Sequence, residues 1–101
     1  MPNFHTDLRS MEVFDGQNVR LETKLTPVND PKLSIVWLHN GIPVVASGRV
    51  KMVHEFGCVA LDIIGVTAAE AGTYICRAKN EVGAAESVAT ILVHRMSFLQ
   101  I

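Results

Sequence analysis

The segment Glu70-Ala71-Gly72-Thr73-Tyr74-Ile75-Cys76 decides the fold of this chain. Tyr74 lies two residues before Cys76, so both side chains point to the same face of an extended strand. A tyrosine two residues before an inward-facing cysteine forms a tyrosine corner, in which the hydroxyl bonds to the backbone of the preceding turn. The only tryptophan, Trp37, is expected to pack beneath that cysteine from a neighbouring strand. The segment therefore predicts an all-β sandwich of two sheets.

The sheet opposite Cys76 offers no cysteine to pair with it. Residues 19–25 alternate between apolar and polar side chains, and Thr23 stands where the partner thiol would lie. Its hydroxyl must find a backbone acceptor, because an unpaired buried hydroxyl costs about 1–3 kcal/mol. Trp37, Tyr74, Cys76 and Thr23 are thus expected to hold the core together by packing and hydrogen bonding, without a disulfide.

Cys58, the only other cysteine, is not expected to replace the missing partner. After it, Val59, Leu61 and Ile63 form an inward set, which turns its own thiol outward. A disulfide needs Cβ atoms within about 4.5 Å, so opposite directions disfavour a bridge to Cys76. Two free thiols, no Asn-x-Ser/Thr glycan acceptor and no signal-like N-terminus together favour a cytoplasmic domain.

The composition argues against several functional classes. The chain has 101 residues, of which 49% are hydrophobic and 19% charged, with a formal net charge of -1. This suits one globular domain and disfavours nucleic acid as a partner, because phosphate binding needs clustered positive charge. No apolar run approaches the length of a membrane helix, so no membrane contact is expected.

Short alternating runs recur about every ten residues and predict strands. The expected strands are 2–8 and 11–14, as one first strand broken near residue 9, then 17–25, 33–38, 42–45, 49–53, 58–64, 73–79 and 84–93, with one helical turn within 67–72. The stretch between 38 and 49 is too short for the extra strand of antibody variable domains. The expected inward side chains are Val19, Leu21, Leu25, Ile35, Trp37, Leu61, Ile63, Tyr74, Cys76, Ala78, Ile91 and Val93.

Several segments within residues 2–93 carry a more specific resemblance. The narrowest are Asn29-Asp30-Pro31 and Phe56-Gly57-Cys58-Val59-Ala60-Leu61-Asp62-Ile63. With them, the chain resembles the intermediate-set immunoglobulin domains of giant sarcomeric proteins, most closely those of invertebrate kettin and its titin-like relatives. We therefore expect an immunoglobulin-like, intermediate-set β-sandwich of Greek-key topology over residues 2–93.

The resemblance implies a non-catalytic scaffold domain of a giant muscle protein. Such domains stand in tandem arrays that bind or span thin filaments near the Z-disc and I-band of the sarcomere. The implied partners are actin filaments, α-actinin and neighbouring immunoglobulin domains, and no contact residue carries over. Two alternatives stay open: a recognition domain of a cell-surface adhesion receptor, which would normally carry the disulfide, and a domain that flanks a giant cytoskeletal kinase.

The polar residues show no catalytic arrangement. The four histidines are scattered over the chain as His5, His39, His54 and His94. None stands at the short spacing of metal ligands. Cys76 is expected in the core rather than in the exposed, electropositive setting that makes a thiol reactive. We expect no enzyme activity, no metal and no cofactor.

The alternation that fills the core also predicts what points to water from the sheet of strands 33–38, 73–79 and 84–93. The apolar side chains on that side are called here the apolar face: Val36, Leu38, Ile75, Val88 and Leu92, with Arg77 and Lys79 at their edge. A contiguous exposed apolar patch is typical of a docking surface, here for actin, a neighbouring domain or a second copy. The alternative is the ordinary preference of strands for β-branched residues.

Residues 94–101 follow the last expected strand and include Met96, Phe98, Leu99 and Ile101. One interpretation is the start of an interdomain linker, although linkers are usually polar. The other is a segment that packs on the apolar face, or adds to a sheet edge of a partner or a second copy.

Overall fold

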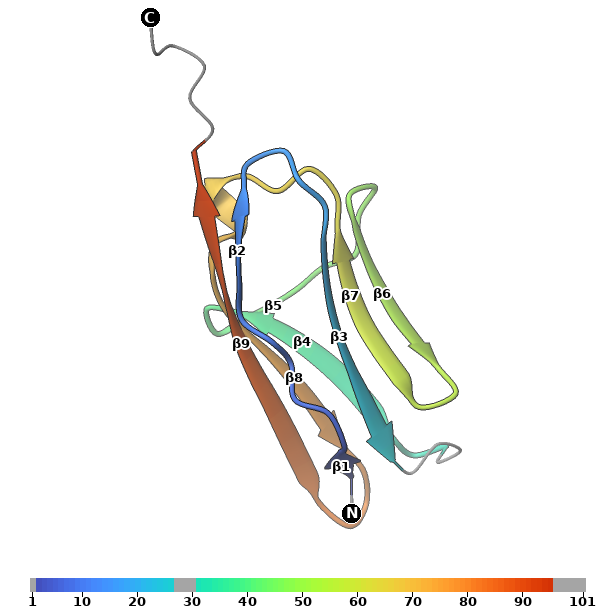
Figure 1. The fold of residues 1–101 in the computed structure, drawn as a ribbon. Coiled ribbons are helices and arrows are strands. Elements are labelled where there is room, and N and C mark those ends of the chain that lie inside the picture. The colour runs from blue at the N-terminus through green and yellow to red at the C-terminus, as the bar shows by residue number, and fades with distance from the viewer. Residues whose placement is uncertain (1, 27–30, 96–101) are drawn as a thin grey trace, which may run out of the picture.

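The computed structural model describes residues 2–26 and 31–95, which form two packed β-sheets (Figure 1). One sheet has the order β1 (Asn3–Phe4), β3 (Val19–Thr26), β7 (Cys58–Ile63), β6 (Val50–Glu55). The other has the order β2 (Met11–Phe14), β9 (Ala84–His94), β8 (Gly72–Lys79), β4 (Ser34–His39), β5 (Ile42–Pro43). A 3-10 turn, η1 (Ala68–Glu70), precedes β8. The predicted all-β sandwich is confirmed.

The described residues also bear on membrane crossing. Within 2–26 and 31–95, the structure has no helix long and apolar enough to span a bilayer.

The first strand is broken, as predicted, and its two pieces belong to different sheets. β1 pairs antiparallel with β3, whereas β2 pairs parallel with β9. The first piece is shorter than the expected 2–8, because side chains take over its backbone bonds. The Lys24 amide donates to Thr6 Oγ1 at 2.9 Å, and the Leu8 amide donates to Ser87 Oγ at 3.0 Å, on the opposite sheet. The chain therefore leaves β3 at Thr6 and crosses to β9.

The core lies between the sheets, where the alternation places it. All the expected inward side chains are buried except Ile35 and Val93, which pack partly buried against the others. Thr23 is 1% exposed, and its hydroxyl donates to the carbonyl of Thr6. The acceptor that this hydroxyl needs is therefore supplied by the crossing segment. Leu8 and Val66 also belong to the core, although both lie outside strands.

The tyrosine corner fixes the turn before β8. The Tyr74 hydroxyl donates to the Glu70 carbonyl at 2.6 Å, and its ring stacks on His39 with centroids 4.3 Å apart. Burial, and then the charge of Glu70, raises the pKa of Tyr74 to about 12, so the hydroxyl stays a donor. The corner joins β4, η1 and β8 around one ring.

Both thiols are free. Burial raises the pKa of Cys76 to about 12, which keeps this core thiol protonated. Cys58 points to the outer side of its sheet and donates to Glu22 Oε2 at 3.1 Å. That hydrogen bond to a carboxylate, followed by partial desolvation, raises the pKa of Cys58.

The Glu70 carboxylate connects η1 to Arg49, the residue just before β6. It accepts from the Thr67 amide at 2.8 Å, which closes a capping box, and from Arg49 Nη2 at 2.9 Å. Burial by itself would raise the pKa of this carboxyl. The hydrogen bonds from Thr67 and Arg49 outweigh burial, and the pKa of Glu70 lies below its ordinary value.

This lowered pKa predicts an acid-sensitive contribution to stability. Glu70→Gln keeps a side-chain oxygen that can accept from the Thr67 amide in the capping box, but it loses the negative charge. We expect the free energy of unfolding at pH 7 to fall by about 1 kcal/mol. A carboxyl whose pKa is lower in the folded than in the unfolded protein stabilises the fold at pH values above its unfolded pKa, near 4.3. This stabilisation is lost as the pH falls through the pKa of the folded state. Urea unfolding from pH 7 to pH 3 should therefore show the two proteins converging below about pH 4.

The exposed Glu81 supplies the control for the substitution itself, since Glu81→Gln should change the free energy of unfolding at pH 7 by no more than about 0.5 kcal/mol. A gap between wild type and Glu70→Gln that stays constant down to pH 3 would contradict the assignment.

Candidate functional site

The outer sides of the two sheets differ in chemistry. On the sheet of β3, β7 and β6, cross-strand partners place Arg20, Asp62 and Lys51 in one row. Arg20 is 3.3 Å from Asp62 and 3.3 Å from Glu22, so much of this charge is already paired within the domain. Surface ion pairs of this kind contribute little energy, and they leave this side polar and hydrated.

The opposite sheet carries the apolar face. Leu38 pairs with Ile75, and Ile75 pairs with Val88, so the three lie in one row across β4, β8 and β9. Val36 occupies the next outward position on β4 and is 42% exposed, and Val88 is 52% exposed. Leu38 and Ile75 are half-buried between their neighbours. These four side chains form one continuous apolar surface.

The other predicted members lie apart from that row. Leu92 is opposite Glu12 of β2, and its strand places Thr90 between it and Val88. Arg77 stands on the central strand β8 rather than at an edge, and its guanidinium pairs with Glu86 at 2.7 Å. Lys79 ends β8 and is exposed. The structure therefore brings together four of the five apolar residues, with Lys79 as the cation whose charge no described carboxylate pairs.

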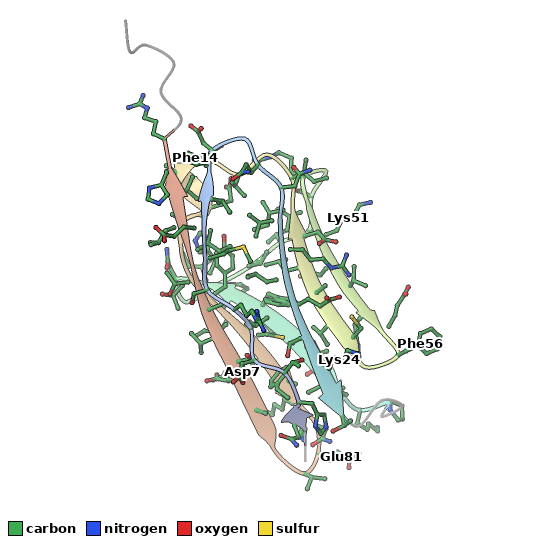
Figure 2. All side chains as sticks on the ribbon, viewed as in Figure 1. Asp7, Phe14, Lys24, Lys51, Phe56 and Glu81 are labelled. Atoms are coloured by element: carbon green, nitrogen blue, oxygen red, sulfur yellow. The ribbon has the colours of Figure 1, made fainter. Side chains whose placement is uncertain are left out.

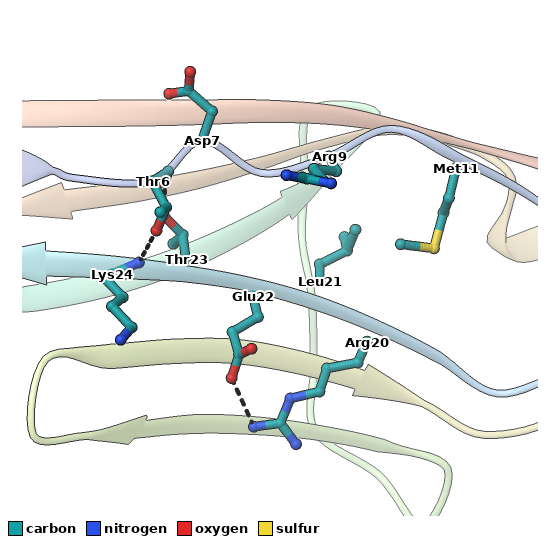
Figure 3. Close-up of a pocket in the computed structure, with 9 residues that line it drawn as sticks. All are labelled: Thr6, Asp7, Arg9, Met11, Arg20, Leu21, Glu22, Thr23 and Lys24. Carbon is teal, nitrogen blue, oxygen red and sulfur yellow. Dashed lines mark hydrogen bonds and ion pairs between the residues drawn. The ribbon is translucent and has the colours of Figure 1, made fainter.

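A groove of about 610 Å³ lies where the first strand crosses between the sheets (Figure 3). Its lining includes Arg9, Met11, Leu21 and the pair formed by Arg20 and Glu22. Since these two charges point to each other along the outside of β3, they do not converge on the groove. The groove follows from the crossing of the chain, and its polar groups show no convergent arrangement for a small molecule.

Three of the four histidines have separate structural partners. His39 bonds to the Ala71 carbonyl at 2.8 Å, His5 to Thr26 at 2.8 Å, and His94 to Glu12 at 2.9 Å. In the described part of the chain, no three His, Cys, Asp or Glu side chains gather where a metal would bind. The tail expected over 94–101 lies, from residue 96 on, outside the described residues.

Sequence alternation missed two apolar features that lie off the sheet faces. Phe56, at the turn between β6 and β7, is 92% exposed. A pocket of about 250 Å³ opens between β5 and β6 and is lined mainly by apolar side chains. Alternation describes the faces of strands, so it says nothing about turns and the open flank of a sandwich. The one available signal was a phenylalanine placed before the turn glycine at 57.

Comparison with known proteins identifies the fold family. The model of the immunoglobulin I-set domain matches residues 2–93. Drosophila melanogaster titin is 42% identical over 100 residues, which are 99% of this chain and 1% of titin. The muscle M-line assembly protein unc-89 of Caenorhabditis elegans is 33% identical over 84 residues, 83% of this chain and 1% of unc-89. The chain thus spans a very small part of both relatives.

Solved structures agree with this result. The titin M4 domain is 28% identical with a TM-score of 0.86, over 92% of this chain and 95% of M4. Titin M10 in complex with an obscurin-like 1 immunoglobulin domain matches with 26% identity and a TM-score of 0.86, over 95% of this chain and 96% of the matched chain. The tyrosine corner, the sheet order and these matches lead to one assignment. The chain belongs to the immunoglobulin I-set domains.

Proposed function

We propose that this domain is a non-catalytic structural unit of a giant muscle protein, placed in the cytoplasm within the sarcomere near the Z-disc and I-band. The observation that carries the proposal is the 42% identity with titin over nearly the whole chain. Similarity to mouse myopalladin, 37% identical over 83 residues, supports the same setting. In this role the domain contributes to filament organisation and elasticity, and its partners are actin filaments, α-actinin and neighbouring immunoglobulin domains.

The proposed contact surface for the thin filament is the continuous part of the apolar face. Val36, Leu38, Ile75 and Val88 expose apolar area, whereas much of the charge on the opposite outer side is paired. Apolar area surrounded by polar residues is typical of protein docking surfaces. With Arg77 held by Glu86, the contact is expected to depend mainly on apolar burial.

Co-sedimentation with filamentous actin tests this proposal. We expect the double variant Val36→Lys/Ile75→Lys to weaken binding at least about 10-fold, because two charges would have to be desolvated in the contact. Raising the salt to about 1 M should weaken wild-type binding only slightly, since screening acts on exposed charges. Met52→Lys is the matched control, because Met52 is 41% exposed and lies on the other sheet.

Two results would contradict the proposal in different ways. Wild-type protein that stays in the supernatant removes actin as a partner. Equal pelleting of the wild type and the double variant removes the apolar face as the contact surface.

A second candidate function is a domain beside a muscle kinase. The striated muscle preferentially expressed protein kinase of Danio rerio is 32% identical over 93 residues, which are 92% of this chain and 3% of the kinase. The sequence that flanks the domain in its full polypeptide separates the two candidates. A kinase domain within the same polypeptide supports the second, and further I-set repeats without one support the first.

A further inference from the structure

Phe56 occupies a backbone position that disfavours it. Phe56 and Gly57 form the two-residue turn between β6 and β7, with φ of 50° and 80°. Turns with positive φ at both positions favour Asn-Gly, and a bulky residue there is unusual. The side chain is 92% exposed and projects from the tip of the hairpin, away from the sandwich (Figure 2).

The chain contains its own reference for this turn. Asn40 and Gly41 join β4 to β5 with φ of 50° and 84°, nearly the same backbone. There the favoured asparagine is present, and its Oδ1 accepts from the Thr73 amide at 2.9 Å. Phe56 has the less favourable backbone, and almost all of its side chain lies outside the packing of the domain. Its aromatic ring is therefore suited to a contact outside the domain.

An apolar pocket suited to an aromatic ring lies on the same molecule. The pocket between β5 and β6 has a volume of about 250 Å³, and its apolar lining is Ile42, Pro43, Val44, Val45, Val50 and Ile63. Ile42 is 69% exposed and Val45 is 78% exposed, so apolar side chains also form its open rim. An apolar cavity of about 150 Å³ accommodates a benzene ring, so this pocket has room for a phenyl group.

The ring of Phe56 does not fill the pocket of its own domain. Val50 and Glu55 are the two ends of β6, and five residue steps along the strand separate them by about 17 Å. The pocket is beside Val50, and Phe56 follows Glu55. If the Phe56 ring enters such a pocket, that pocket therefore belongs to another copy of the domain.

We propose that Phe56 of one copy of this domain inserts into the pocket between β5 and β6 of a second copy. The two surfaces are different parts of the domain, so the contact is heterologous: the first copy keeps an unused pocket and the second copy keeps an unused ring. Such a contact propagates into rings or open chains of domains. Because a single aromatic group provides most of the buried area, we expect a dissociation constant on the order of 0.1–1 mM.

A complementation experiment tests this pairing. Phe56→Asn removes the ring and restores the favoured turn residue, and Val45→Lys places a charge on the pocket rim. In sedimentation equilibrium at about 1 mM protein, the wild type should form species larger than dimers, and each variant alone should stay monomeric, with association weakened about 30-fold or more. An equimolar mixture should form dimers that do not grow, because only one ring and one pocket remain.

Matched measurements keep the result clear. Val82→Asn, at another hairpin residue that is 72% exposed, should associate like the wild type. Phe56→Asn should unfold at a higher urea concentration than the wild type, which shows that lost association does not come from lost structure. A monomeric wild type, or a mixture of variants that stays monomeric, would overturn the proposal. So would a Val45→Lys variant that still associates normally, since the ring would then bind a different surface.

Discussion

Replacing Leu61 by alanine is expected to lower the free energy of unfolding by about 3–4 kcal/mol. Leu61 is 0% exposed on β7, and its strand lies between β3 and β6. Truncation removes apolar contacts and leaves a cavity that rigid sheets on both sides cannot fill by collapse. Urea denaturation followed by fluorescence of the buried Trp37 measures the loss.

Leu92 provides a control with the same chemical change. It is 49% exposed on the outer side of β9, so Leu92→Ala should change the free energy of unfolding by no more than about 0.5 kcal/mol. Similar losses for Leu61→Ala and Leu92→Ala would mean that the strands are placed in the wrong register. A one-residue shift would exchange the inner and outer sides of each strand.

Thr23→Cys should convert the domain into a disulfide-stabilised one. Thr23 on β3 and Cys76 on β8 are 1% and 0% exposed, and they belong to opposite sheets that share one core. In a Cys58→Ser background, oxidation should close a loop of roughly fifty residues and raise the free energy of unfolding by about 4 kcal/mol over the reduced form. Urea denaturation of the same variant, oxidised and reduced, measures the difference.

The comparison within one variant cancels the cost of losing the threonine hydroxyl, which donates to the Thr6 carbonyl. Titration of thiols in the unfolded protein shows whether the bond has formed. If two thiols remain reactive after oxidation, position 23 does not face Cys76 closely enough for a disulfide, and the assignment of Thr23 to the partner site is wrong.

Much of the core was predictable because strand alternation is a local property. Val19, Leu21 and Leu25 on β3, and Tyr74, Cys76 and Ala78 on β8, are buried as the period of two requires. The need of the Thr23 hydroxyl for an acceptor also followed from burial alone. The identity of that acceptor did not, because it depends on where the crossing segment passes.

Features that depend on contacts between distant segments escaped prediction. Leu8 and Val66 are buried from irregular segments, where no period assigns a side. The pairing of Arg77 with Glu86 depends on the register of β8 against β9, which the turn between the two strands sets and which alternation alone does not predict. The pocket between β5 and β6 likewise depends on how the edges of the two sheets approach each other, which alternation along one strand does not describe.

The presence of threonine rather than cysteine at position 23 also determines how far this domain can lengthen under tension. An unfolded chain extends by up to about 3.4 Å per residue, but residues enclosed by a disulfide cannot contribute. A bond between positions 23 and 76 would withhold about 180 Å of contour length. Because both cysteines of the chain are free, no disulfide joins positions 23 and 76. A single unfolding event therefore releases this contour length to the polypeptide in which the domain stands.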